Sequence, residues 1–357
     1  MALNIQELLR TAVQRRASDL HLTVGLPPQL RFDGVLTPLP IAPLTEDQTR
    51  ELAFQMLEPS QVARFEQTKE SDTAYSIKGF SRFRVNLYRQ RGSIAAAIRV
   101  IPFQIPSIGE LGLPSILEDF AIRPSGLFVV SGPTGCGKST TLAAMIELIN
   151  SRRNCHIVTV EDPIEYLHRH RKATVNQREL GVDTFSFQEA LRHLVREDPN
   201  VIMIGEMRDL ETMSAALTLA ETGHLVLTTL HTSDAVHAIQ RIVDVFPPYQ
   251  QMQIRVQLSL VLLGVMVQQL IPRTSGQGRV VACEVMNVTP AIGNMLRENQ
   301  LQQLRSSLQT GRQHGMCTMN QSLAELLLDK SITWEEALKR SLDPEDLKRL
   351  TQPEKKR

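Results

Sequence analysis

Gly132-Pro-Thr-Gly-Cys-Gly-Lys138-Ser139 fits the phosphate-binding pattern G-x-x-x-x-G-K-[ST] at every position. A short apolar run precedes this stretch at 126–131, and a helical pattern follows it at 140–150. A strand, a glycine-rich turn and a helix are the context in which the pattern binds a nucleotide. Backbone N–H groups of the turn and the helix N-terminus would supply partial positive charge to the phosphates. These flanks make a chance glycine-rich turn the weaker interpretation.

The phosphate-binding pattern predicts a role for individual residues of the loop. Lys138 would reach the β- and γ-phosphates of ATP, and Ser139 would place its hydroxyl on Mg²⁺. The predicted nucleotide-binding residues are Gly132, Pro133, Thr134, Gly135, Cys136, Gly137, Lys138, Ser139 and Thr140.

Composition limits the class of protein. A length of 357 residues suggests two or three domains. The formal net charge of +1 shows no excess of positive charge over the whole chain of the kind that nucleic-acid binding requires. The four cysteines stand far apart without a C-x-x-C pair, which favours a reducing cytoplasm over a zinc site or a disulfide framework. No signal peptide is expected at the N-terminus. The apolar stretch 258–267 is too short to span a bilayer, so we expect no membrane insertion.

The first hundred residues have the pattern of a small α+β domain. Helical spacing of apolar residues at 5–13 and 45–58 accompanies several strand-like segments. The expected strands are 17–22, 73–77, 80–88 and 95–100. We therefore assign residues 1–101 to an N-terminal domain, and the proline- and glycine-rich stretch 102–114 to a linker or hinge.

The rest of the chain alternates short apolar runs with helical patterns. This rhythm predicts βαβ units and a largely parallel sheet with helices on both faces, an α/β domain over 115–290. Past about residue 250 we expect a mainly helical chain, with a helical subdomain at 291–350 and a tail at 351–357. The expected parallel strands are 127–130, 157–160, 201–204 and 225–229.

Two acidic positions follow predicted strands, where the ligand crevice of an α/β sheet lies. Glu165 ends the segment 161–165, and a carboxylate there would orient or deprotonate the water that attacks the γ-phosphate. Glu206 follows 201–204, and Gly205 stands where an Asp often holds the metal, so Glu206 alone would serve the Mg²⁺ shell or the water. The alternatives are a polar turn for the first segment and a capped strand end for the second.

Histidines and arginines complete the candidate site. His224 and His231 bracket the predicted strand 225–229, which places His231 at its ligand end, while a structural role remains an even alternative for His224. Arg84 and Arg99 lie on predicted strands of the small domain. An arginine from another domain or subunit commonly stabilises charge on a transferring phosphoryl group. The alternative is that these arginines are solvated strand residues.

Together these stretches resemble the secretion-type ATPases that drive type IV pili and type II secretion, over nearly the whole chain. The matching motifs are 17–22, the arginine-bearing strand 81–86, the Walker A loop 132–141, the aspartate box 161–165, the Walker B region 198–209 and the histidine box 222–232. Two stretches, 291–298 and 315–323, resemble segments of the pilus-retraction branch. Gly293 replaces the first arginine of the retraction motif A-I-R-N-L-I-R-E.

The resemblance implies a PAS-like N-terminal domain and a RecA-like ATPase domain, with six subunits in a ring. It implies that Arg84 and Arg99 reach the nucleotide at the subunit junction, and that the linker is the hinge of each subunit. Glu165 is then the first choice for activating water, with Glu206 close behind, and His231 would sense the γ-phosphate. Hydrolysis would turn the platform protein at the cytoplasmic face of the inner membrane, so that pilin subunits leave the fibre.

Two rival functions remain on the sequence alone. One is an accessory retraction-type subunit that couples a second retraction ATPase to the pilus, although all the catalytic acids are present. The other is a related ring ATPase for secretion or DNA transfer, which the missing tetracysteine insertion and the match at 291–298 disfavour. The guanine-reading motif N-K-x-D is absent, which argues against a GTPase.

Overall fold

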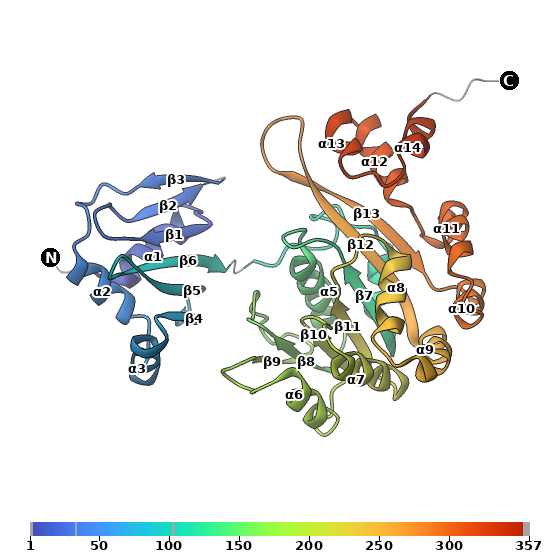
Figure 1. The fold of residues 1–357 in the computed structure, drawn as a ribbon, viewed down its shortest axis with the longest axis horizontal. Coiled ribbons are helices and arrows are strands. Elements are labelled where there is room, and N and C mark those ends of the chain that lie inside the picture. The colour runs from blue at the N-terminus through green and yellow to red at the C-terminus, as the bar shows by residue number, and fades with distance from the viewer. Residues whose placement is uncertain (1–2, 33, 102–103, 353–357) are drawn as a thin grey trace. The chain divides into compact units, whose positions relative to one another are not determined.

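The computed structural model describes residues 3–32, 34–101 and 104–352, and the chain divides after Gln104 into two compact units (Figure 1). The first unit is α+β, and the second alternates helices with parallel strands, so the predicted fold class is confirmed. Among the residues described, none of the helices has both the length and the apolar character that crossing a bilayer requires.

The first unit is an antiparallel sheet of order β3-β2-β1-β6-β5-β4. Successive side chains of a strand alternate between faces. In β5, Phe83, Val85 and Leu87 are buried against the helices, while Arg82 and Arg84 lie on the other face. The elements are α1 (Ile5–Gln14), β1 (Asp19–Leu22), β2 (Gln29–Phe32), β3 (Val35–Pro38), α2 (Glu46–Phe54), α3 (Pro59–Thr68), β4 (Glu70–Ile77), β5 (Ser81–Gln90) and β6 (Ser93–Ile101).

The second unit is a seven-stranded sheet of order β13-β12-β7-β11-β10-β8-β9. All neighbouring pairs are parallel except β12 and β13. The carboxyl ends of β7, β11, β10 and β8 therefore meet at one edge of the sheet. The strands are β7 (Gly126–Ser131), β8 (His156–Glu161), β9 (Thr174–Glu179), β10 (Val201–Ile204), β11 (Leu225–Thr229), β12 (Leu262–Pro272) and β13 (Arg279–Asn287).

Helices cover both faces of this sheet, as predicted. The central strand β7 shows why: Leu127 and Val129 pack into one apolar cluster, and Phe128 and Val130 pack into the other. The helices α4 and α5 cover the second face, and α6 to α9 cover the first. They are α4 (Ile116–Ile122), α5 (Lys138–Arg152), α6 (Phe187–Leu194), α7 (Leu210–Glu221), α8 (Ala235–Asp244) and α9 (Pro248–Val261).

The expectation of a mainly helical chain past residue 250 is wrong for residues 262–287, which form the long antiparallel hairpin β12–β13. Both faces of β12 are buried, so its apolar residues run continuously and show no alternation from which a strand could be recognised. Helices do follow the hairpin. They are α10 (Pro290–Arg297), α11 (Leu301–Thr310), the 3₁₀ turn η1 (Gly311–His314), α12 (Met319–Leu328), α13 (Trp334–Leu338) and α14 (Pro344–Thr351).

The predicted linker 102–114 lies only partly within the described residues, since 102–103 fall outside them, as do residues 353–357 of the predicted tail. From Ile105 onward the stretch belongs to the second unit. Ile108 and Leu113 are buried in its apolar core, beside α4 and α5.

Candidate active site

The phosphate loop lies between β7 and α5, as its sequence predicts. Gly132, Gly135 and Gly137 have φ values of +137°, +78° and +91°, which side-chain-bearing residues rarely adopt. Gly137 precedes the first residue of α5, so the loop leads directly into the positive end of that helix. An added Cβ at Gly135 would meet nothing within 4 Å, which leaves the outer side of the loop open to a ligand.

Lys138 is the buried cation of this loop. Its Nζ donates to the carbonyl oxygens of Gly132 at 2.9 Å and of Pro133 at 3.1 Å. Burial lowers the pKa of Lys138, and the acidic groups Cys136, Glu206 and Glu165 act in the opposite direction. Two of the predicted catalytic carboxylates therefore act electrostatically on the predicted phosphate-binding lysine.

Gln268 on β12 holds the phosphate loop through hydrogen bonds of its side-chain amide. This buried side chain donates from Nε2 to the carbonyl oxygen of Cys136 at 2.6 Å and accepts at Oε1 from Thr141 Oγ1 at 2.8 Å. A Cβ at Gly132 would lie 2.4 Å from the Gln268 carbonyl oxygen, so glycine is required for this close approach. No motif marks Gln268 in the sequence, where its signal is a polar residue within an apolar run.

Glu206 and His231 follow the neighbouring strands β10 and β11 and come together. His231 Nε2 lies 3.3 Å from Glu206 Oε2, and Arg208 pairs with the other carboxylate oxygen. The Glu206 side chain is 17% exposed and that of His231 is 45% exposed. The carboxylate is thus partly withdrawn from water while the imidazole remains open to a ligand.

Gly205, the residue before Glu206, packs against the neighbouring strand β8. A Cβ there would lie 3.4 Å from the Val160 carbonyl oxygen, and its own N–H donates to that oxygen at 2.8 Å. Thr229 Oγ1 donates to the Gly205 carbonyl oxygen at 2.6 Å. The residue before Glu206 is therefore fixed by both neighbouring strands.

The acidic segment 161–165 divides into a buried part and an exposed part. Glu161 is buried, and this burial raises its pKa. Its Oε1 accepts from Thr159 Oγ1 at 2.6 Å and from Gln177 Nε2 at 3.1 Å. Glu165 is exposed, and the hydroxyl of the adjacent Tyr166 lies 2.8 Å from Thr140 Oγ1 in α5. Tyr166, which no sequence motif marks, thus connects the Glu165 segment to α5, the helix that follows the phosphate loop.

His224 lies at the opposite end of β11. Its Nδ1 is 2.9 Å from the Leu219 carbonyl oxygen and 3.2 Å from Thr222 Oγ1, groups that end α7. This contact gives His224 a structural role, the alternative that the sequence left open.

Arg84 and Arg99 lie in the first unit and stand opposite each other in the β5–β6 pair. Arg84 makes two hydrogen bonds to Asp72, at 3.4 and 3.1 Å, and Arg99 Nε donates to Asp19 at 3.1 Å. The Arg99 side chain is 69% exposed and that of Arg84 is 43% exposed. Both are therefore held on the sheet by carboxylates and remain accessible.

A family model described as type II/IV secretion system protein matches residues 2–345. The chain belongs to this family. Two relatives from Pseudomonas aeruginosa are similar to this chain over most of its length. The type IV pilus retractation ATPase PilT is 44% identical, over 96% of this chain and 100% of that protein, and the type IV pilus ATPase PilU is 40% identical, over 97% and 91%.

A solved structure shows the same likeness in three dimensions. The crystal structure of the pilus retraction motor PilT with bound ADP is 47% identical to this chain, with a TM-score of 0.91 over 97% of this chain and 99% of that one. The likeness thus spans both units and is not limited to the phosphate loop.

Proposed function

We propose that this chain hydrolyses ATP and, as a ring of six copies, powers retraction of type IV pili. The observation that carries the proposal is the contact between Glu206 and His231 at the sheet edge that holds the Lys138 loop. The full-length likeness to relatives named as pilus retraction ATPases supports the same function.

The loop fits a nucleoside triphosphate bound together with Mg²⁺. Its outer side is open, and Lys138 Nζ is held at the loop by the carbonyl oxygens of Gly132 and Pro133. Mg²⁺ prefers oxygen ligands and is usually held by one or two protein groups together with phosphates and water. Ser139 and Glu206 would supply those two groups, and the ion would neutralise charge on the phosphate oxygens.

Glu165 would activate the attacking water, because it is exposed at the site and acts on Lys138. His231 would report the state of the γ-phosphate. The next residue, Thr232, donates its N–H to Ser131 Oγ at 2.8 Å, directly before the phosphate loop. A shift of His231 would therefore be transmitted to β7 and to the N-terminus of α8, which Asp234 caps.

Arg84 and Arg99 would act across the subunit junction. The Arg84–Asp72 pair is exposed, and exposed ion pairs are worth only about 0–1 kcal/mol, so a phosphate could compete for that guanidinium. The Arg99 side chain is itself 69% exposed, so a phosphate could reach it from solvent. The stretch 102–114 would act as the hinge between an N-terminal domain, 1–101, and the ATPase domain, 115–290.

The motor would work in the cytoplasm, docked on an inner-membrane platform protein, without binding nucleic acid. A second candidate is an accessory subunit that works beside another retraction ATPase, and it is supported by the presence of two similar pilus ATPases, PilT and PilU, in one organism. A steady-state ATPase assay on the wild type and on Glu206→Ala separates the two, because an accessory subunit without hydrolysis would show no loss. Deletion of the gene should give hyperpiliated cells that do not twitch, whereas loss of pili would overturn a retraction role.

A further inference from the structure

A pocket of about 380 Å³ lies in the second unit where α9 passes into β12 and β13 passes into α10. Leu262 opens β12 opposite Leu127 near the start of β7, and Asn287 closes β13 opposite Gly264. The pocket is therefore at the amino edge of the parallel strands. The phosphate loop follows the carboxyl end of β7, so the pocket is separate from the candidate active site.

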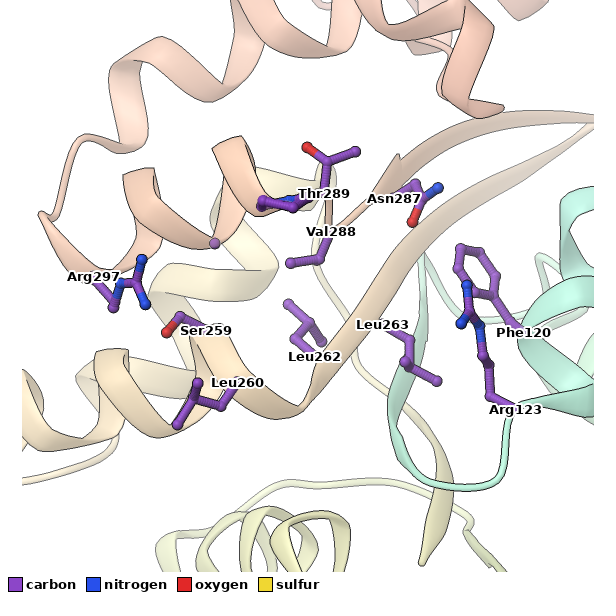
Figure 2. A pocket seen from close by; sticks show the side chains of 12 residues that line it. Phe120, Arg123, Ser259, Leu260, Leu262, Leu263, Asn287, Val288, Thr289 and Arg297 are labelled. Carbon is purple, nitrogen blue, oxygen red and sulfur yellow. The ribbon is translucent and has the colours of Figure 1, made fainter. Parts of the chain in front are cut away.

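The floor of the pocket is apolar and its two ends are cationic. Figure 2 shows Leu262 and Leu263 in the middle, with Arg297 on one side and Arg123 on the other. The lining contains no acidic residue. Arg297 donates to the neutral amide of Asn294 at 3.2 Å, and neither arginine has a carboxylate partner within the described part of the chain. The pocket thus presents two uncompensated positive charges across an apolar surface.

Gly293 forms part of the wall. A Cβ at this position would lie 3.3 Å from the Ser259 carbonyl oxygen, tighter than an ordinary contact, so glycine allows α10 to lie close to α9. The pilus-retraction motif that this segment resembles has an arginine here. A side chain of that length would occupy the space and add a third positive charge. Gly293 therefore keeps open a pocket that the usual residue would fill.

An exposed apolar stripe leads to the pocket along α9. Tyr249, Met252, Val256 and Leu260 are spaced by three, four and four residues, which places them on one face of the helix. They are 81%, 72%, 40% and 68% exposed, and Leu260 itself lines the pocket. Contiguous exposed apolar surface beside a pocket is typical of a protein-binding site.

We propose that this pocket binds a peptide segment of a protein partner, in which a large apolar side chain lies between two carboxylates. The apolar group would cover Leu262 and Leu263, and the carboxylates would pair with Arg123 and Arg297. Charge complementarity decides the occupant, since an apolar segment alone would leave both guanidinium groups without a partner and a basic segment would be repelled. The inference goes beyond the proposed function, because binding here requires neither ATP nor a pilus.

Selection from random peptides tests the proposal with no assumption about the partner. The purified full chain would be immobilised and panned against short random peptides displayed on phage. We expect enrichment of Leu, Ile or Phe flanked on both sides by Asp or Glu. The double variant Arg123→Glu and Arg297→Glu should instead enrich Lys and Arg at the flanking positions. Enrichment without acids, or identical peptides from both proteins, would overturn the proposal.

A synthetic copy of an enriched peptide gives the quantitative test by fluorescence anisotropy. Arg297→Glu should weaken its binding by about tenfold or more, the usual effect of losing a charge-assisted hydrogen bond. Arg255→Glu, on α9 but not in the pocket lining, is the matched control and should change binding little. Gly293→Arg should block peptide binding, because the long side chain would fill the pocket. Gly293→Ala adds only a methyl group, so it measures the effect of crowding against Ser259 without filling the pocket.

Two further measurements complete the test. Every variant should retain wild-type ATP hydrolysis, which shows that it is folded and that any binding loss is independent of the proposed motor function. Light scattering compares the oligomeric mass of the double variant with that of the wild type. A change in mass would mean that a second copy of the chain fills the pocket, and the proposal would be wrong.

Discussion

The side-chain amide of Gln268 joins two parts of the phosphate loop, because it donates to the Cys136 carbonyl oxygen at 2.6 Å and accepts from Thr141 at 2.8 Å. One buried residue of β12 thereby fixes the loop and the first turn of α5. Gln268→Leu would leave both partners buried without a hydrogen bond, at a cost of about 1–3 kcal/mol for each such group. We expect ATP affinity to fall by about tenfold or more, measured by titration with a fluorescent nucleotide.

Gln269→Leu is the control for this prediction, since the neighbouring side chain points to the opposite face of β12. It should bind ATP as the wild type does. If Gln268→Leu lowers only the melting temperature and leaves nucleotide affinity unchanged, Gln268 supports the fold and does not position the loop.

The roles of Glu165 and Glu206 can be separated by their dependence on Mg²⁺. Glu165→Gln removes the proposed base and should lower kcat by about 10²- to 10⁴-fold with ATP affinity retained. Glu206→Gln removes a proposed metal ligand, so its loss of rate should be partly restored at high Mg²⁺. The measurement is a Mg²⁺ titration of kcat for both variants. Restoration of Glu165→Gln instead of Glu206→Gln would exchange the two roles.

Functional residues could be predicted from the sequence where they lie in a short continuous motif. The loop 132–139 specifies its own strand, turn and helix, and the four strand ends that form the site follow short apolar runs. Because parallel strands end at the same edge, Glu206 and His231 could be assigned to one site before their contact was seen.

Long-range packing was not predictable in the same way. Gln268 reaches Cys136 across 132 positions of sequence, and no local pattern marks that pair. The hairpin β12–β13 was missed because strands buried on both faces lack the alternation that identifies a half-buried strand. The partner of Tyr166, likewise, is set by the approach of the segment after β8 to the first turn of α5 and not by the spacing of residues.

Subunit mixing tests whether Arg84 and Arg99 act on a neighbour's nucleotide. Arg84→Ala or Arg99→Ala alone should lower ATP hydrolysis by about 10³-fold or more, and so should Lys138→Ala. In a mixture of Arg84→Ala with Lys138→Ala, some junctions combine an intact arginine with an intact loop, so activity should return in part. Arg91→Ala serves as the control on the same domain. Absence of recovery in the mixture, with each single variant inactive, would mean that the arginine does not act across a junction.

Glu161 should make the protein less stable as pH rises. Burial raises its pKa in the folded state, so the unfolded chain loses this proton first and binds fewer protons over the interval between the two pKa values. The two side-chain donors, Thr159 and Gln177, reach the same oxygen, Oε1, and an amide in place of the other oxygen keeps these two hydrogen bonds. Glu161→Gln should therefore raise the melting temperature more at about pH 8 than at about pH 4, where this carboxyl is largely protonated in the unfolded chain as well and the two states bind nearly the same number of protons. An equal change at both pH values in calorimetry would show that this carboxyl is already ionised inside the fold.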